Sequence, residues 1–258
     1  MKRLTVFLIC LCVCTAVRAQ FAVDTLSLRS GFKASQLIAP AVLGASGLAV
    51  HFLGHEAVEV PVRDFTLKEL SKPEVVGICP WADYIRFVPA AAHVGMGLVG
   101  VKSQHALVDR CIESALALLF AFGGGYVAKK IFASLRPDGS SYDSFPSGHT
   151  IVAFTGSELV RMDYGWAWGT GAYALSSAVG VSRIVADRHW VGDILAGAGW
   201  GILSAHIGGW LLEPVKSLFG IPDIEWDGLG TPRKVQLAVA PGIDPVSGST
   251  MASLSLRF

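Results

Sequence analysis

Three short blocks between residues 129 and 193 decide how this chain is interpreted: Lys129-x6-Arg136-Pro137, Pro146-Ser147-Gly148-His149 and Ser182-Arg183-x5-His189-x3-Asp193. They combine basic side chains, two histidines, one carboxylate and a Ser-Gly turn. These are the residue types that bind a phosphoryl group and transfer protons around it. Each block also stands where the sequence pattern predicts the end of a helix, so the three can meet in the folded chain.

The chemistry of each block follows from its spacing. Lys129 and Arg136 are seven residues apart, which places both on about the same face of a predicted helix that Pro137 ends. Ser147 and Gly148 open the next helix, where free backbone amides bind anions and glycine permits close approach. His189 and Asp193 are spaced i, i+4, so the carboxylate can orient the imidazole.

Each block taken alone has an ordinary structural explanation. Basic residues at a helix end complement the helix dipole. Ser147 can be a plain N-cap, with His149 a surface residue of the first turn. His189 and Asp193 can be a surface pair on one helix. The functional interpretation depends on all three blocks occurring in this order within one stretch.

Outward from these blocks, apolar runs predict an all-α bundle of about six helices. The expected helices cover residues 36–53, 87–101, 107–135, 147–161, 166–185 and 190–212, and a short amphipathic helix is expected within 63–70. Residues 234–240 and 252–258 alternate apolar and polar side chains around a Pro- and Gly-containing turn, which predicts a short C-terminal β-hairpin. The expected division is 1–19 signal peptide, 20–84 lead-in and first helix, 85–212 core and 213–258 extension.

Composition points to a membrane. The 258 residues are 52% hydrophobic and only 16% charged, whereas soluble domains carry about 25% charged residues. The chain, with a net charge of +1, lacks the excess of basic residues that is typical of nucleic-acid-binding proteins. Residues 1–19 have a basic start, a short apolar run and a small residue at the end, which predicts a secretory signal peptide, with an uncleaved anchor as the alternative.

The cysteines suggest neither a disulfide scaffold nor a metal site. Removal of the signal segment would leave Cys79 and Cys111, which have no metal-ligand spacing. No metal and no cofactor are expected. The histidines outside the three blocks match no motif and are interpreted as structural or solvent-facing: His51, His55, His93, His105 and His206.

At the three blocks the sequence closely resembles the type 2 phosphatidic acid phosphatase (PAP2) superfamily, over roughly residues 85–212. This superfamily includes lipid phosphatases, bacterial non-specific acid phosphatases and vanadate-dependent haloperoxidases. The resemblance implies a phosphohistidine mechanism in which His189 attacks phosphorus, Asp193 orients it and His149 is the acid and base. It also implies a phosphate-binding set: Lys129, Arg136, Ser147, Gly148 and Arg183.

The expected function is therefore metal-independent hydrolysis of a lipid phosphate or diphosphate of the bacterial envelope, with lipid A, undecaprenyl diphosphate, phosphatidylglycerol phosphate or phosphatidate as candidates. The principal alternative is a periplasmic acid phosphatase acting on soluble esters. A vanadate haloperoxidase and a non-catalytic lipid-binding protein are further alternatives. Asp187 and Arg188 are expected to tune substrate access, and Asp83 and Tyr84 to shape the mouth of the site.

The expected location is the cell envelope, membrane-associated, with the site facing the periplasm and the inner membrane favoured over the outer. This creates a conflict of topology. If the mature N-terminus is periplasmic, three crossings before Arg136 would put the site in the cytoplasm. The sequence therefore predicts that one or all of the first three apolar runs do not cross. The best candidate is 87–101, which has about 15 residues where about 20 are needed.

Overall fold

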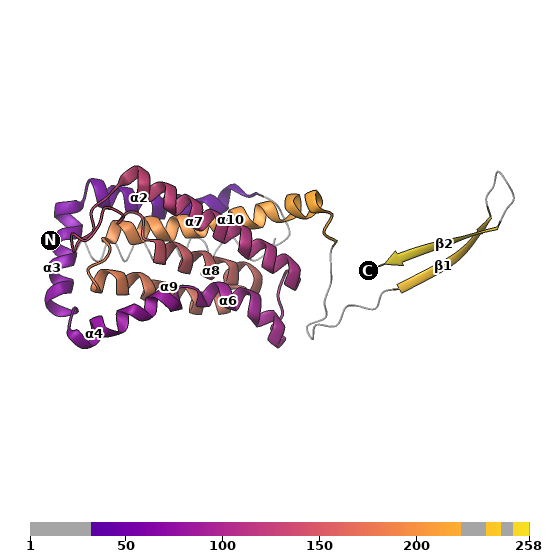
Figure 1. Ribbon diagram of the computed structural model, residues 1–258, viewed down its shortest axis with the longest axis horizontal. Coiled ribbons are helices and arrows are strands. Elements are labelled where there is room, and N and C mark those ends of the chain that lie inside the picture. Colours follow the sequence, from indigo (N-terminus) through magenta and orange to yellow (C-terminus); the bar gives the residue numbers. More distant parts are fainter. Residues whose placement is uncertain (1–31, 223–235, 244–249, 258) are drawn as a thin grey trace.

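The computed structural model describes residues 32–222, 236–243 and 250–257, and its main body is a bundle of helices (Figure 1). Seven of the described helices have eight or more residues: α2 (Ile38–Phe52), α3 (Val60–Glu69), α6 (Val88–Gly95), α7 (Leu107–Phe132), α8 (Gly148–Tyr164), α9 (Trp166–Val185) and α10 (Val191–Phe219). Shorter turns of helix connect them: η1 (Ala34–Leu37), η2 (His55–Glu59), α4 (Pro73–Ile78), η3 (Cys79–Trp81), α5 (Ala82–Ile85) and η4 (Met96–Val99). The expectation of an all-α bundle is confirmed.

The helix α10 is the centre of the bundle. It packs against α2, α7 and α8, and α8 in turn packs against α9 and α6. The long helices lie side by side with their axes roughly along the long dimension of the body (Figure 1). Because α10 contacts three neighbours, its small residues are buried on several sides, among them Ala196, Gly201 and Ala205.

The bundle has two ends with different groups of polar residues, and the candidate site residues named from the sequence lie at one of them. At one end, His51 near the end of α2 bonds to Ser134 after α7, and the Ser147 amide at the start of α8 donates to the Asp193 carbonyl of α10. We call this the catalytic end. The helices α3 and α4 lie across it, at the left of Figure 1. At the opposite end, α6 meets the C-terminal end of α8 through His93 and Asp163.

The helices approach closely because glycines face the contacts. An added Cβ at Gly47 of α2 would lie 2.4 Å from the Ala196 backbone nitrogen of α10, and one at Gly156 of α8 would lie 2.3 Å from the Ala90 nitrogen of α6. At these separations only hydrogen fits between the backbones. Such small-residue contacts are typical of helices packed within membranes.

The outer surface is apolar along α7. Its outward face exposes large hydrophobic side chains over several turns: Leu119, Phe122, Tyr126, Val127 and Ile131. Three helical segments are long and apolar enough to cross a membrane, namely Ala34–Phe52, Leu107–Phe132 and Val191–Phe219. The chain is therefore a membrane protein by composition and by the surface that it presents.

The helix α7 ends earlier than the sequence predicts. It stops at Phe132 because Ala133 adopts a left-handed conformation with φ of 42°. Arg136 therefore lies in the loop after α7, not on one helical face with Lys129, and this part of the prediction was wrong. Pro137 restricts the backbone of Arg136 to extended conformations, but the helix has already ended four residues earlier.

The second apolar run is divided between two short helices. It forms α6 and η4, and neither is a candidate membrane span by itself. The chain nevertheless traverses the bundle here, because Asp83 lies at the catalytic end and His93 at the opposite end. The short helices α4, η3 and α5 supply the remaining length. Whether residues 87–101 cross a membrane stays a prediction, and this run is not among the candidate spans of the described residues.

The last helix is longer than predicted. It continues through Pro214 to Phe219 instead of ending at residue 212. A proline inside a helix removes one backbone hydrogen bond but does not prevent the helix from continuing. Farther along the chain, β1 (Gln236–Ile243) and β2 (Thr250–Arg257) pair antiparallel, with Gln236 opposite Arg257 and Ile243 opposite Thr250.

Candidate active site

The three sequence blocks converge at the catalytic end. Lys129 comes from the last turn of α7 and Arg136 from the loop that follows it. Ser147 and Gly148 begin α8, Arg183 comes from the last turn of α9, and His189 and Asp193 flank the start of α10. Lys129 and Arg136 both act electrostatically on His189, and Arg183 acts on His149. The predicted residues therefore surround one site.

His189 is held as a nucleophile would be. Its Nδ1 lies 3.3 Å from Oδ2 of Asp193, and its side chain is almost fully buried. With Nδ1 directed to the carboxylate, Nε2 remains for attack on phosphorus. Burial lowers the pKa of His189, and the positive charges of Lys129 and Arg136 lower it further, against the opposing effect of Asp193. The neutral, nucleophilic imidazole is thereby favoured.

The Asp193 carboxylate is itself fixed by donors that are not in the motifs. Its Oδ2 accepts a hydrogen bond from the Ser144 hydroxyl at 2.5 Å and from the Trp190 amide at 2.9 Å. Asp193 is fully buried. A carboxylate held by several donors keeps one orientation, so the imidazole that depends on it is also fixed.

A second buried carboxylate, Glu59, lies behind Asp193. Its Oε1 accepts from the Gly192 amide at 3.0 Å and lies 3.2 Å from Nδ1 of His51, while its Oε2 lies 2.8 Å from Nδ1 of His55. His51 also lies 3.5 Å from Oδ1 of Asp193. The negative charge at the N-terminus of α10 is favoured by the helix dipole. This network links η2 and α2 to the start of α10.

His149 faces the mouth of the site. Its Nε2 lies 2.5 Å from Oδ1 of Asp83, and that oxygen lies 3.9 Å from Nη1 of Arg183. Burial and the charge of Arg183 lower the pKa of His149 to about 4, whereas the hydrogen bond with Asp83 raises it. The same hydrogen bond holds the pKa of Asp83 below its ordinary value. His149 therefore has an acidic partner of its own.

The cations are oriented by the loop between α7 and α8. The Lys129 ammonium donates to the carbonyl of Asp143. Arg136 pairs with the Asp143 carboxylate, with Nε 2.9 Å from Oδ1 and Nη2 3.1 Å from Oδ2. Nε of Arg183 is buried and has no hydrogen-bond partner among the described residues. A bound phosphate would supply an acceptor to these groups.

The start of α8 can complete an anion cradle. Ser147 is fully buried, and its hydroxyl accepts a hydrogen bond from Thr150 at 3.1 Å. A Cβ added at Gly148 would lie 3.9 Å from Cε of Lys129. Gly148 therefore faces Lys129 with no side chain between them. The first turn of a helix has free backbone amides, which can bind an anion.

Two ion pairs bind the segment between Arg183 and His189 to the rest of the catalytic end. Asp187 has φ of 57° and pairs with Arg63 of α3 through two contacts of 2.7 Å. Arg188 pairs with Asp138 at 3.2 Å. A small pocket lies beside His189, with Arg63, Trp190 and Glu59 among its lining residues. These contacts place Asp187 and Arg188 at the edge of the site.

Sequence reasoning missed several residues of this site: Asp83 beside His149, Ser144 on Asp193, Asp143 on Arg136, and the His51–Glu59 pair. Asp83 was expected to shape the mouth, but its contact with His149 was not predicted. Asp83 and Ser144 reach their partners across 66 and 49 positions of the chain, so tertiary packing brings them together. The Arg136–Asp143 and His51–Glu59 pairs are local, but they form across irregular segments, where helical spacing does not apply. Ser144 and Asp143 could have been singled out only for lying in the polar loop just before the second block.

Comparison with known proteins identifies the family that this part of the chain resembles. Residues 111–213, which include all three blocks, match the PAP2 superfamily. The chain is 39% identical over 134 residues to the lipid A 1-phosphatase of Porphyromonas gingivalis, covering 50% of this chain and 30% of that protein. It is 28% identical over 132 residues to the lipid A 4'-phosphatase of Helicobacter pylori, covering 46% of this chain and 64% of that protein. The chain thus spans less than two thirds of either relative.

Two solved structures resemble the fold at 19% identity. The first is LpxE of Aquifex aeolicus, with a TM-score of 0.44, and the match covers 59% of this chain and 94% of that chain. The second is a transmembrane PAP2-type phosphatidylglycerolphosphate phosphatase of Bacillus subtilis, with a TM-score of 0.47, and the match covers 69% of this chain and 96% of that chain. Both scores are below 0.5, so the assignment rests on the matched sequence and the residues of the site. On those grounds residues 111–213 belong to the PAP2 superfamily.

Proposed function

We propose that this chain is a phosphatase that removes phosphate from a lipid of the bacterial envelope, with lipid A or a lipid of similar headgroup chemistry as the substrate. The observation that carries the proposal is the pairing of His189 with Asp193 beside Lys129 and Arg136, at the end of a bundle with an apolar exterior. The two lipid A phosphatases among its relatives support this choice of substrate.

The first chemical step forms a phosphohistidine. Nε2 of His189 attacks phosphorus while the bond from phosphorus to the lipid oxygen breaks. His149 donates a proton to that oxygen, which leaves as an alcohol. Lys129, Arg136 and Arg183 stabilise the charge that develops on the other phosphate oxygens. No step in this sequence requires a metal ion.

The second step hydrolyses the phosphohistidine. His149, now neutral, removes a proton from water, and the water oxygen attacks phosphorus as the bond to His189 breaks. Free phosphate leaves, and the site returns to its first state. A bound phosphate adds negative charge beside His149 and raises its pKa above the value of the unloaded site, which favours the protonated form needed in the first step.

The location of the site is part of the proposal. We place the catalytic end at the periplasmic side of the inner membrane, where envelope lipid phosphates are accessible. The exposed apolar face of α7 favours a membrane substrate over the soluble ester of an acid phosphatase.

The test is phosphate release by the purified protein in detergent. The panel comprises lipid A, phosphatidylglycerol phosphate, undecaprenyl diphosphate, phosphatidate and a soluble aryl phosphate. We expect at least one lipid to be turned over far faster than the soluble ester, and His189→Ala to abolish release. Equal turnover of the soluble ester would favour an acid phosphatase. Phosphate release by His189→Ala at the wild-type rate would refute the mechanism.

Two neighbouring lysines provide a matched pair of variants. Lys129 faces the site, whereas Lys130 is exposed and lies over the ring of Tyr126. Loss of one charge-assisted phosphate contact is expected to lower kcat/KM by about tenfold to a hundredfold. Lys129→Ala should show this decrease and Lys130→Ala should not. Equal effects of the two variants would mean that Lys129 does not bind the phosphate.

A further inference from the structure

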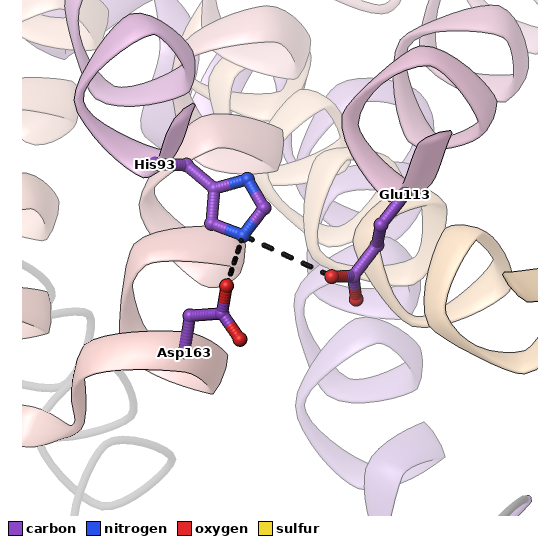
Figure 2. Close-up of side chains that lie close together, drawn as sticks. All are labelled: His93, Glu113 and Asp163. Atoms are coloured by element: carbon purple, nitrogen blue, oxygen red, sulfur yellow. Dashed lines mark hydrogen bonds and ion pairs between the residues drawn. The ribbon is translucent and has the colours of Figure 1, made fainter. Parts of the chain in front are cut away.

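A second group of ionisable side chains lies at the end of the bundle opposite the catalytic end. It consists of His93 from α6, His105 from the loop before α7, Glu113 from α7 and Asp163 from α8. His93, Glu113 and Asp163 are almost completely buried, with exposed fractions of 0%, 0% and 1%. Figure 2 shows these three pointing toward one another from three different helices.

The donor atoms are close enough to share one ion. Nε2 of His93 lies 2.9 Å from Oδ2 of Asp163 and 3.8 Å from Oε2 of Glu113. Nδ1 of His105 lies 2.6 Å from Oδ1 of Asp163 and 3.7 Å from the same oxygen of Glu113. Ligands of a tetrahedral zinc ion are separated from one another by about 3.3 Å, as bond lengths of about 2.0–2.1 Å require. The observed separations lie on both sides of that value.

The Glu113 carboxylate is buried with no hydrogen-bond donor from the described part of the chain against it. Both of its carboxylate oxygens are buried, and neither has a hydrogen-bond partner among the described residues. A buried carboxylate normally has a donor or a cation against it, because burial without one is strongly unfavourable. Glu113 points at two imidazoles that are already bonded to Asp163. The group therefore has more carboxylate oxygens that accept hydrogen bonds than N–H groups that donate them.

The Arg110 guanidinium, which contacts the backbone of His93, does not neutralise this group. Arg110 directs Nη1 to the backbone carbonyls of His93 and Val94 and to the hydroxyl of Tyr164. No ion pair joins Arg110 to Glu113 or Asp163 among the described residues. Among the residues that the structure describes, the two carboxylates therefore have the histidines as their ion-pair partners. With neutral histidines the group carries two negative charges.

His93 is oriented as a metal ligand would be. Its Nδ1 lies 2.8 Å from the hydroxyl of Ser114, whose oxygen can accept a hydrogen bond from an N–H at that nitrogen. This arrangement leaves the lone pair of Nε2 directed at Glu113 and Asp163. Metal-binding histidines commonly have such a bond on the ring nitrogen away from the ion, which sets the tautomer and the ring orientation.

We propose that His93, His105, Glu113 and Asp163 bind one divalent transition-metal ion, with Zn²⁺ as the ion that fits best. Two imidazoles and two carboxylates form a mixed nitrogen and oxygen donor set, which suits zinc and neighbouring transition metals better than Mg²⁺ or Ca²⁺. A dication would neutralise the two carboxylates and give Glu113 the partner that it lacks.

The role of this ion would be structural. The group joins α6, α7, α8 and the loop before α7. Within α8 it is separated from His149 by 14 residues, or about 21 Å at the helical rise of about 1.5 Å per residue. An ion at that distance takes no part in phosphate transfer. It would hold together the end of the bundle where α6 and α8 finish, independently of the function proposed for the catalytic end.

The experiment measures zinc in the full chain, purified in detergent with an affinity tag that contains no histidine. The protein is incubated with excess Zn²⁺, desalted and analysed by mass spectrometry for zinc per chain. We expect about one zinc ion per wild-type chain, and a lower thermal unfolding temperature after chelation. Glu113→Gln, which keeps the shape of the side chain, should lose the ion and the effect of the chelator.

Glu59→Gln is the matched control. Glu59 is also a buried carboxylate between two histidines, but both of its oxygens already have partners. This variant should retain zinc at the wild-type level. The proposal is overturned if wild type and Glu113→Gln contain the same amount of zinc, or if chelation leaves the unfolding temperature of wild type unchanged. Zinc content and unfolding do not depend on phosphatase activity, so failure of this proposal is distinguishable from failure of the proposed function.

Discussion

The two histidines of the catalytic end differ because their carboxylate partners differ. His189 is paired with Asp193, which is fully buried and held by Ser144 and the Trp190 amide. His149 is paired with Asp83, whose side chain is about half exposed at the mouth. A fixed, buried partner suits a nucleophile that must keep one orientation. A partner at the mouth suits a group that gains and loses a proton in each turnover.

Asp83 is therefore a positioning residue, and its removal should change the pH dependence of the reaction. Asp83 raises the pKa of His149, while burial and Arg183 lower it. In Asp83→Asn the pKa of His149 falls, so the protonated form is lost at a lower pH as the pH rises. We expect the alkaline limb of the kcat/KM profile with a lipid phosphate to move to lower pH.

Asp138→Asn is the control for this prediction. Asp138 pairs with Arg188 at the edge of the site, 3.2 Å away, and has no contact with His149. Its variant should keep the wild-type pH profile, although its rate can change. If Asp83→Asn also keeps the wild-type profile, Asp83 does not set the protonation of His149.

At the scale of the helices, the contact between α2 and α10 positions the site. The helix α10 carries Asp193 at its start, and α2 carries His51, which touches that carboxylate. The two backbones meet through glycines. A Cβ at Gly47 would lie 2.4 Å from the Ala196 nitrogen and 2.7 Å from the Gly192 carbonyl, whereas a Cβ at Gly44 would have no atom within 4 Å.

Gly47→Ala should therefore destabilise the bundle, while Gly44→Ala should not. Forcing a methyl group into a closed helix contact costs about 1–3 kcal/mol. At Gly44 alanine has free space and gains roughly 0.5–1 kcal/mol from its higher helix propensity. Thermal unfolding in detergent would compare the two variants with wild type. Equal unfolding temperatures for the two alanine variants would contradict the close contact.

At the scale of the whole molecule, the direction of α2 relates the two ends of the bundle to the two sides of the membrane. This helix is a candidate membrane span that starts at the end away from the site and finishes at the catalytic end, where His51 contacts Ser134 and Asp193. If α2 crosses the membrane, Lys33 and the catalytic end must lie on opposite sides. A periplasmic site therefore implies a cytoplasmic Lys33.

Single cysteines would test this arrangement. In a background without native cysteines, Lys33→Cys lies before α2, and Ser140→Cys lies in the loop that follows α7 at the catalytic end. A reagent that does not cross membranes should label Ser140→Cys in intact cells and label Lys33→Cys only after the cells are opened. Labelling of both positions from the same side would show that α2 does not cross.

The motif residues and the helical class were predictable from the sequence because both are local signals. Apolar runs separated by polar turns predict helices, and the three blocks combine residue types that bind phosphate at predicted helix ends. Helix limits were less accurate at α7, where the left-handed Ala133 ends the helix before Arg136. Nothing in the sequence around a single alanine predicts a left-handed conformation at that residue.

Contacts between distant segments were decided only by the tertiary structure. Asp83 meets His149 across 66 positions of the chain, Glu59 meets Gly192 across 133, and His93 meets Asp163 across 70. Helical periodicity relates residues three or four positions apart and says nothing about which helix faces which. The partners of the catalytic histidines, the direction of α2 and the group around Glu113 all depend on that packing, because a buried charge takes its partner from whichever helix lies against it.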